Sequence, residues 1–140
     1  MKQINLDELH KTAAEAANSA YAPYSSFRVG AALLADDGTV ITGCNVENRS
    51  YGLGICAERT AVVKGLSEGK KQFIALAIAT PDASYPVAPC GACRQVLSEF
   101  AQADTPVRFA GNGSAQVNTT IGELLPWDSL YDLRERGLES

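Results

Sequence analysis

The sequence has few of the residues that mark several common classes of protein. Its 140 residues include one histidine, one tryptophan and one methionine, and its 12 basic against 16 acidic residues give a net charge of −4. A chain of this charge repels a phosphate backbone, so we expect no nucleic-acid partner. It lacks the roughly 18 consecutive apolar residues of a membrane span, and its charged start is unlike a signal peptide. We therefore expect a cytoplasmic protein without a membrane partner.

Four cysteines and a large apolar fraction are what the sequence does contain. With 46% hydrophobic residues and no internal repeat or linker, the chain is expected to fold as a single domain over residues 1–140. Without an export signal the cysteines should stay reduced, which favours metal or redox chemistry over a disulfide framework. Their spacing must decide between the two.

Hydrophobic periodicity predicts helices interleaved with strands. We expect helices at residues 6–20, 55–65 and 91–100, and strands at residues 27–34, 40–44, 73–79 and 107–110. Asn5 caps the first helix, the first two strands form a hairpin, and the charged tail at 122–140 is partly helical. This order predicts an α/β fold, a three-layer α/β/α sandwich around a mixed sheet of about five strands.

Three of the cysteines occur in two short motifs that each open a predicted helix. The motifs are CAE at residues 56–58 and PCGAC at residues 89–93. Two cysteines separated by two residues can direct both sulfurs to one point, and a third thiolate from another helix start completes three corners of a tetrahedron. Cys56, Cys90 and Cys93 are therefore predicted to bind Zn²⁺ and to leave its fourth corner for water.

Three thiolates around a divalent cation carry a net charge of about −1, which makes the metal a weaker acid. Helix N-termini offset that charge through their unpaired N–H groups. Arg59 and Arg94, which directly follow the two motifs, are candidates for hydrogen bonds to the sulfurs.

Glu58 lies two residues beyond a predicted metal ligand. A carboxylate at that spacing can reach a metal-bound water while staying outside the ligand set. It can take a proton from the water and return it to the substrate, so we expect Glu58 to be the catalytic acid and base.

Together these motifs match the zinc deaminase signature, in which a His or Cys, one residue and Glu are followed by Pro-Cys-x-x-Cys. The surrounding segments NVENRSYGLGICAERTA and APCGACRQVL extend the match, and weaker similarity runs from YAPYSSFRVGAAL to ELLP, over roughly residues 5–126. On these motifs the chain resembles the small homotetrameric zinc-dependent cytidine deaminases, and it is expected to share their fold.

The resemblance implies hydrolytic deamination of free cytidine and deoxycytidine to the corresponding uridines, without an organic cofactor. A zinc-bound hydroxide attacks C4 of cytosine while Glu58 moves protons to ring N3 and to the leaving amino group. The resemblance also implies a homotetramer in which neighbouring subunits complete each site, with Tyr51 contributed to a neighbour.

The same resemblance assigns further contacts to the nucleoside. Asn45 and Glu47 bind the ribose hydroxyls, and Phe27 packs beside the pyrimidine. Ala57 and the backbone at Pro89 offer hydrogen-bonding edges to the base. The amide and carboxylate suit sugar hydroxyls, since together they donate and accept.

Two positions depart from the pattern of similar enzymes. Arg49 replaces a small residue near the expected edge of the pocket. The C-terminal segment LPWDSL at residues 125–130 lacks a Phe that often closes a neighbour's site, and Trp127 or Tyr131 could replace that ring. We therefore expect an altered pocket mouth that admits bulkier groups on the exocyclic nitrogen or on ring carbon 5.

Two other interpretations remain open at the level of sequence. A non-catalytic structural zinc domain needs a fourth protein ligand, for which the sequence offers Cys44 or His10. We interpret Cys44 as a small buried hydrophobic residue and His10 as an exposed residue. The same chemistry could also act on a nucleoside antibiotic or another aminated heterocycle.

Overall fold

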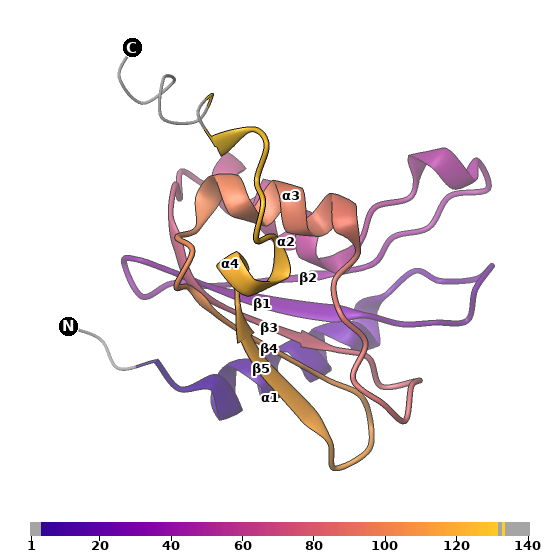
Figure 1. Cartoon of the computed structure of the whole chain (residues 1–140). Coiled ribbons are helices and arrows are strands. Elements are labelled where there is room, and N and C mark those ends of the chain that lie inside the picture. The colour runs from indigo at the N-terminus through magenta and orange to yellow at the C-terminus, as the bar shows by residue number, and fades with distance from the viewer. Residues whose placement is uncertain (1–3, 132, 134–140) are drawn as a thin grey trace.

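Five strands form one mixed sheet in the computed structural model, which describes residues 4–131 and 133 (Figure 1). The spatial order is β2-β1-β3-β4-β5, in which β3 and β4 are parallel and the other neighbours are antiparallel. The strands are β1 (Gly30–Ala35), β2 (Val40–Cys44), β3 (Phe73–Ala79), β4 (Pro106–Ala110) and β5 (Gln116–Thr120). The continuous apolar run in β3 is explained by its central place, where both faces are covered.

Helices cover both faces of the sheet, so the predicted three-layer α/β/α arrangement is confirmed (Figure 1). α1 packs on one face, where Leu9 and Ala13 meet the alanines of β1 and β3. α2 and α3 pack on the other face over the larger core, which includes Leu33, Leu76 and Phe109. The helices are α1 (Leu6–Ala16), α2 (Ala57–Ser67), α3 (Gly91–Phe100) and α4 (Ile121–Leu124), with 3-10 turns η1 (Ala17–Ser19) and η2 (Tyr51–Leu53).

Helix bounds differ from the prediction where the chain turns to pair with a distant segment. The α-helical part of the first helix ends at Ala16 and not at residue 20, because Tyr21 is drawn into a bridge with Val46. α2 begins at residue 57 and not at 55, because Ile55 pairs with Val46 from the other side. The bounds of α3 are those predicted.

Strand bounds differ for a related reason. β1 begins at Gly30 and not at residue 27, because the side chain of Asn45 takes the hydrogen bonds of the Phe27 carbonyl and the Val29 amide. β5 was not predicted as a separate strand. Apart from Val117 its residues are polar, and most are exposed, since β5 forms one edge of the sheet and lacks the alternating apolar pattern.

A glycine in β2 determines how closely α2 approaches the sheet. A Cβ atom added at Gly43 would lie 2.5 Å from the Ala61 amide nitrogen and 2.6 Å from the Ala57 carbonyl oxygen. Glycine is thus the residue that lets the first turns of α2 lie directly on the backbone of β2. Because Cys56 and Glu58 belong to this end of α2, the contact also fixes where these two residues lie.

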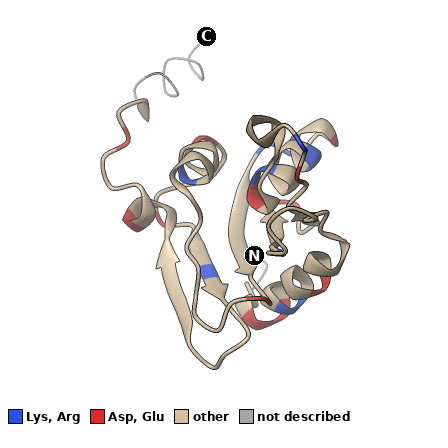
Figure 2. Cartoon of the chain, turned by 90° about the vertical axis from the view of Figure 1, so that its right-hand side faces the viewer, with Lys and Arg blue, Asp and Glu red and all other residues tan. Residues whose placement is uncertain are grey.

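Charges are spread over the molecule, and basic positions lie on separate elements with acidic positions beside them (Figure 2). Among residues 4–131 and 133, ion pairs between distant segments include Arg28–Asp82, Lys70–Asp37 and Arg108–Asp7. Within the described residues, no helix combines the length and the apolar character needed to cross a bilayer.

The contact at Gly43 predicts that Gly43→Ala lowers the free energy of unfolding by roughly 1–3 kcal/mol, because the new methyl group must displace α2 from the sheet. Urea denaturation followed by circular dichroism measures the change. Gly52→Ala is the matched control, since a Cβ at Gly52 meets no atom within 4 Å in the described structure. Equal stabilities of the two variants would contradict this packing.

Candidate metal centre and its cavity

The N-termini of α2 and α3 carry the three cysteines of the predicted metal site. Cys56 is the N-cap of α2, Cys90 is the N-cap of α3, and Cys93 lies in the first turn of α3. In the described structure neither cap sulfur forms a capping hydrogen bond with the backbone of its own helix, so both can turn toward each other. The first-turn N–H groups and the helix dipoles supply positive potential, which stabilises thiolates.

The three sulfurs converge. Their Sγ atoms all lie within 4.8 Å of one another, and those of Cys56 and Cys90 are 3.9 Å apart. A tetrahedral zinc with bonds of about 2.3 Å holds its sulfurs about 3.8 Å apart, so the spacing and the donor chemistry fit this ion. The cluster found among the described residues contains these three cysteines and neither Cys44 nor His10.

Hydrogen bonds within the cluster separate the pKa values of its thiols. The Cys93 thiol, followed by the Arg59 guanidinium and Cys90, lowers the pKa of Cys56 to about 5 against the opposing effect of burial. The same bond to Cys56, together with burial and the charge of Glu58, raises the pKa of Cys93. The Cys56 thiolate therefore forms readily, and a thiolate at Cys93 forms less readily beside it. A divalent cation that replaces the shared proton would let both sulfurs bind as thiolates.

Glu58 lies in the first turn of α2 and is 4% exposed. Burial, the largest effect, raises the pKa of its carboxyl group above the usual range, and the charge of Cys56 acts in the same direction. A raised pKa makes the carboxylate a stronger base, which suits a group that carries protons. The arrangement therefore provides a proton carrier beside a cluster of metal-binding sulfurs.

The two arginines that follow the motifs point in different directions. Arg59 donates from Nη2 to the Cys56 sulfur at 3.3 Å, as expected of a group that offsets the thiolate charge. Arg94 instead donates from Nε to the Pro89 carbonyl at 2.8 Å and from Nη1 to the Leu124 carbonyl at 3.2 Å. These two hydrogen bonds hold the loop before Cys90 against α4. Arg94 thus donates to two carbonyl groups in place of the sulfur that we expected as its acceptor.

A cavity of about 410 Å³ opens at the cluster. This volume lies in the range of small-ligand sites. Of the residues predicted to contact substrate, Asn45, Glu47, Tyr51 and Ala57 line it, whereas Phe27 and Pro89 are not among its lining residues. The lining consists of Val29, Asn45, Val46, Glu47, Tyr51, Gly54, Ile55, Cys56, Ala57, Glu58, Arg59, Ile78, Thr80, Val87, Ala88 and Cys90.

Several lining residues escaped prediction. Ile78 and Thr80 lie at the carboxyl end of β3, and Val87 and Ala88 lie in the loop that leads to Cys90. Ligands commonly bind at the carboxyl end of a strand that leads into a crossover helix. The order of β3 before α3 in the sequence would therefore have indicated these residues as part of the cavity.

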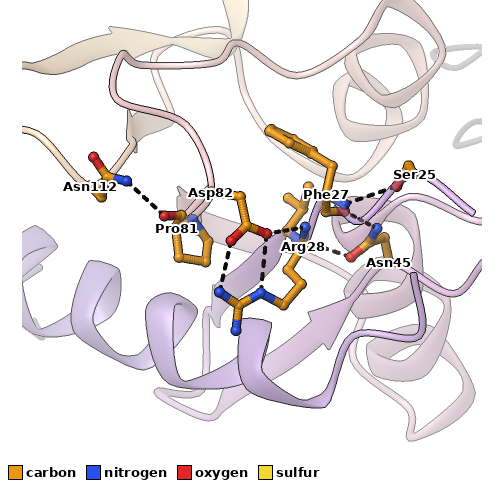
Figure 3. Close-up of polar contacts among 8 residues, drawn as sticks. Ser25, Phe27, Arg28, Asn45, Pro81, Asp82 and Asn112 are labelled. Atoms are coloured by element: carbon orange, nitrogen blue, oxygen red, sulfur yellow. Dashed lines mark hydrogen bonds and ion pairs between the residues drawn. The ribbon is translucent and has the colours of Figure 1, made fainter. Parts of the chain in front are cut away.

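Asn45 and Glu47 are engaged with the segment before β1. The Asn45 side chain accepts from the Val29 amide at 2.9 Å and donates to the Phe27 carbonyl at 2.8 Å (Figure 3). Glu47 accepts from the backbone amides of Tyr24 and Ser25 at 3.0 and 3.2 Å and from the Ser25 hydroxyl group. The Ser25 bond is the main reason that the pKa of Glu47 is lowered, so this carboxylate is charged and acts as an acceptor.

One of the residues that line the cavity, Tyr51, is an exposed aromatic residue that contacts a second one, Tyr24. Tyr51 is 81% exposed, and its ring lies 5.9 Å from that of Tyr24 at an angle of 59°. Arg49 lies in the exposed turn just before Tyr51 and does not line the cavity. Trp127 and Tyr131 line a different cavity, formed with α3 and α4, and Trp127 is 91% exposed.

The two residues considered as a fourth metal ligand lie elsewhere. Cys44 ends β2 and is half-buried. His10, expected to be exposed, is also half-buried, and its Nδ1 atom has no hydrogen-bond partner within the described chain. Burial, followed by the charge of Arg108, lowers the pKa of His10. The exposure prediction is wrong because this side of α1 meets Arg108 of β4.

Comparisons with known proteins agree with this geometry. Residues 3–108 match the model of the family described as the cytidine and deoxycytidylate deaminase zinc-binding region. The cytidine deaminase of Halalkalibacterium halodurans is 53% identical over 119 residues, which cover 84% of this chain and 89% of that protein. A blasticidin-S deaminase of Bacillus cereus is 34% identical over 137 residues, covering 90% of this chain and 96% of that one.

The fold is likewise that of solved relatives. A crystal structure of cytidine deaminase from Burkholderia pseudomallei superposes with a TM-score of 0.83 at 45% identity, covering 88% of this chain and 98% of that one. The family match, the curated relatives and the converging sulfurs agree with one another. The chain belongs to the cytidine and deoxycytidylate deaminase family, whose zinc-binding region it carries.

Proposed function

We propose that this chain deaminates free cytidine and deoxycytidine by hydrolysis, with Zn²⁺ held by Cys56, Cys90 and Cys93 and with Glu58 carrying protons. The observation that carries the proposal is the meeting of the three sulfurs and a buried carboxylate in one cavity of small-ligand size. Family membership supports the same substrate class.

Cys56, Cys90 and Cys93 would hold Zn²⁺, whose Lewis acidity would make water a nucleophile at neutral pH. Glu58 accepts a proton from the attacking water and delivers it to ring N3 as the water oxygen bonds to C4. Glu58 next carries the hydroxyl proton to the 4-amino group, the C4–N bond breaks, and ammonia leaves. One water is consumed, and uridine keeps the proton on N3. Arg59 offsets negative charge on the Cys56 sulfur throughout.

The opposite wall of the cavity is proposed to bind the sugar. Glu47 is charged and already held by donors from residues 24 and 25, so it accepts from a sugar hydroxyl without having to move. The Asn45 amide group is fixed by two backbone bonds and has one N–H left to donate. Ala57 and the backbone at Pro89 are proposed to face the base, and Phe27 to pack beside the pyrimidine ring.

Cytidine with a bulkier group on the exocyclic nitrogen or on ring carbon 5 is a second candidate substrate class, and a nucleoside antibiotic is a third. The match to a blasticidin-S deaminase favours the third class. An ultraviolet assay against cytidine, deoxycytidine, substituted cytidines and adenosine ranks these substrates. Slower deamination of the substituted cytidines than of plain cytidine would exclude the second class.

We propose a homotetramer in which neighbouring subunits complete each site. We propose that its interface lies on the surface next to the cavity. Tyr51 and Leu53 in η2 are 81% and 73% exposed, and Tyr24 beside them is 47% exposed. Grouped aromatic and aliphatic side chains of this kind are typical of interfaces. Because the metal-binding sulfurs must stay reduced, we also propose a reducing, cytoplasmic location.

Removing the proposed proton carrier tests the reaction. Glu58→Gln should lower kcat by roughly 10²-fold or more while one zinc per chain and the fold are kept, because the amide cannot accept the proton. Cys44→Ser is the control and should change neither rate nor zinc content. If Cys44→Ser instead releases zinc, the structural-zinc interpretation is favoured.

Metal removal should expose a reactive thiolate. After chelation, iodoacetamide should alkylate Cys56 rapidly above about pH 5 and slowly below it, since the lowered pKa keeps the thiolate until the pH falls through that value. Peptide mass spectrometry measures the rate, and added zinc should block the reaction. Alkylation with the midpoint of an ordinary thiol, near pH 8.5, would contradict the proposed charge state.

The proposed assembly predicts a mass by light scattering of four times the 14.8 kDa of one chain. Leu53→Asp should lower that mass and the activity together, because a charge at the interface separates subunits that complete one another's sites. Val40→Asp, which alters another exposed apolar residue, should change neither. A fully active monomer would exclude shared sites.

A further inference from the structure

Arg28 and Asp82 join two loops that approach the cavity from different strands. Arg28 lies just before β1 and Asp82 lies just after β3. The Asp82 carboxylate accepts three hydrogen bonds from this one residue: from the Arg28 amide at 2.8 Å, from Nε at 3.1 Å and from Nη2 at 2.8 Å. Figure 3 shows the guanidinium lying along the carboxylate, with Asn45 on one side and Pro81 and Asn112 on the other.

On one side the pair continues into the wall proposed to bind the sugar, here called the sugar wall and defined as residues 25–29 and 45–47. The Asn45 amide group holds the residues on both sides of Arg28, through the Phe27 carbonyl and the Val29 amide. The Phe27 amide donates to the Ser25 hydroxyl at 3.0 Å, and that hydroxyl donates to Glu47. A movement of Arg28 is therefore passed to both Asn45 and Glu47.

On the other side the pair holds the metal loop, defined as residues 80–90. Asn112 donates from its side chain to the Pro81 carbonyl at 2.9 Å and from its amide to the Ala83 carbonyl at 2.7 Å. Asp82 is thus held between two residues that are anchored beyond β4. From there the metal loop runs through Val87 and Ala88, which line the cavity, to Cys90.

The β1–β3 ladder ends where Gly30 pairs with Ala79, and the Arg28–Asp82 pair continues the connection beyond that end. Between residues 22–29 and residues 80–90, the hydrogen bonds found in the described chain are the three that Asp82 accepts from Arg28. The Arg28 bonds also lower the pKa of Asp82 to about 2, so the pair stays charged over the working pH range of most enzymes. With Arg28 and Asp82 side chains 43% and 27% exposed, the attraction is open to screening by salt.

We propose that Arg28 and Asp82 are positioning residues that fix the gap between the sugar wall and the metal loop, and so set the affinity for the nucleoside. This inference rests on the proposed function. Neither residue touches the reacting atoms, so the pair should affect binding of the nucleoside, which spans both walls, and not the proton transfers at Glu58.

The test compares KM and kcat for cytidine in the zinc-loaded enzyme. Asp82→Ala should raise KM roughly three- to tenfold with kcat within about twofold and zinc content unchanged. Arg28→Ala should raise KM less, because its backbone amide still donates to Asp82. The double variant should match Asp82→Ala alone, and Arg28→Lys should recover part of the affinity because it restores one charged donor. Raising the salt concentration should raise the KM of the unmodified enzyme more than that of the double variant.

Lys70→Ala is the matched control. It removes an ion pair of similar length, 2.7 Å to Asp37, and of similar exposure, in a part of the chain that does not line the cavity. Its KM should be unchanged. Amide hydrogen exchange of the enzyme without nucleoside gives a second readout, in which Asp82→Ala should speed exchange in both the sugar wall and the metal loop.

Two results would overturn the inference while leaving the proposed function intact. One is an unchanged KM in Asp82→Ala, or a fall in kcat without a rise in KM, in an enzyme that deaminates cytidine. The other is exchange that speeds up in neither or in only one of the two segments. Failure of the unmodified enzyme to deaminate any nucleoside would instead refute the proposed function, and the inference with it.

Discussion

The convergence of three sulfurs from two separate helices is the constraint on which the site depends. Thiolates repel one another, so they can share one place only if positive potential surrounds them. Two helix N-termini and the Arg59 guanidinium supply that potential. The small contact surfaces of Gly43, Ala57 and Ala61 let α2 lie close to β2, and this seating brings Cys56 to the same point as the start of α3. The fold therefore serves to hold two helix ends against each other.

The same convergence explains the state of the buried carboxyl group. Glu58 shares a helical turn with Cys56, and burial beside sulfur charge raises its pKa. A raised pKa makes this carboxylate a stronger base than one in water, which favours its role as a proton carrier. A metal-binding sulfur and the buried proton carrier thus lie within one stretch of three residues, 56–58.

The sequence predicted correctly those elements and site residues that depend on neighbours along the chain. The bounds of β3 and α3 follow from apolar runs and cap positions, and the place of the cysteines at two helix starts follows from their spacing. Residues whose roles depend on distant partners were missed. β5 is a strand because β4 lies beside it, and Arg94 turns away from the sulfurs because the Pro89 and Leu124 carbonyls lie within its reach. His10 is half-buried because α1 places it near Arg108 of β4, nearly a hundred positions along the chain, which no periodicity in the first helix records.

The parallel pairing of β3 with β4 also bears on how a new chain comes to hold metal. Parallel strands need a crossover, and here the crossover contains Cys90 and Cys93. Cys90 lies 34 positions beyond Cys56, so the three sulfurs meet only when this non-local contact has formed, and non-local contacts are slow steps of folding. A chain that has not yet formed the contact carries thiols that are open to oxidation as well as to metal. The topology therefore couples capture of the ion to the folding of the chain between α2 and α3.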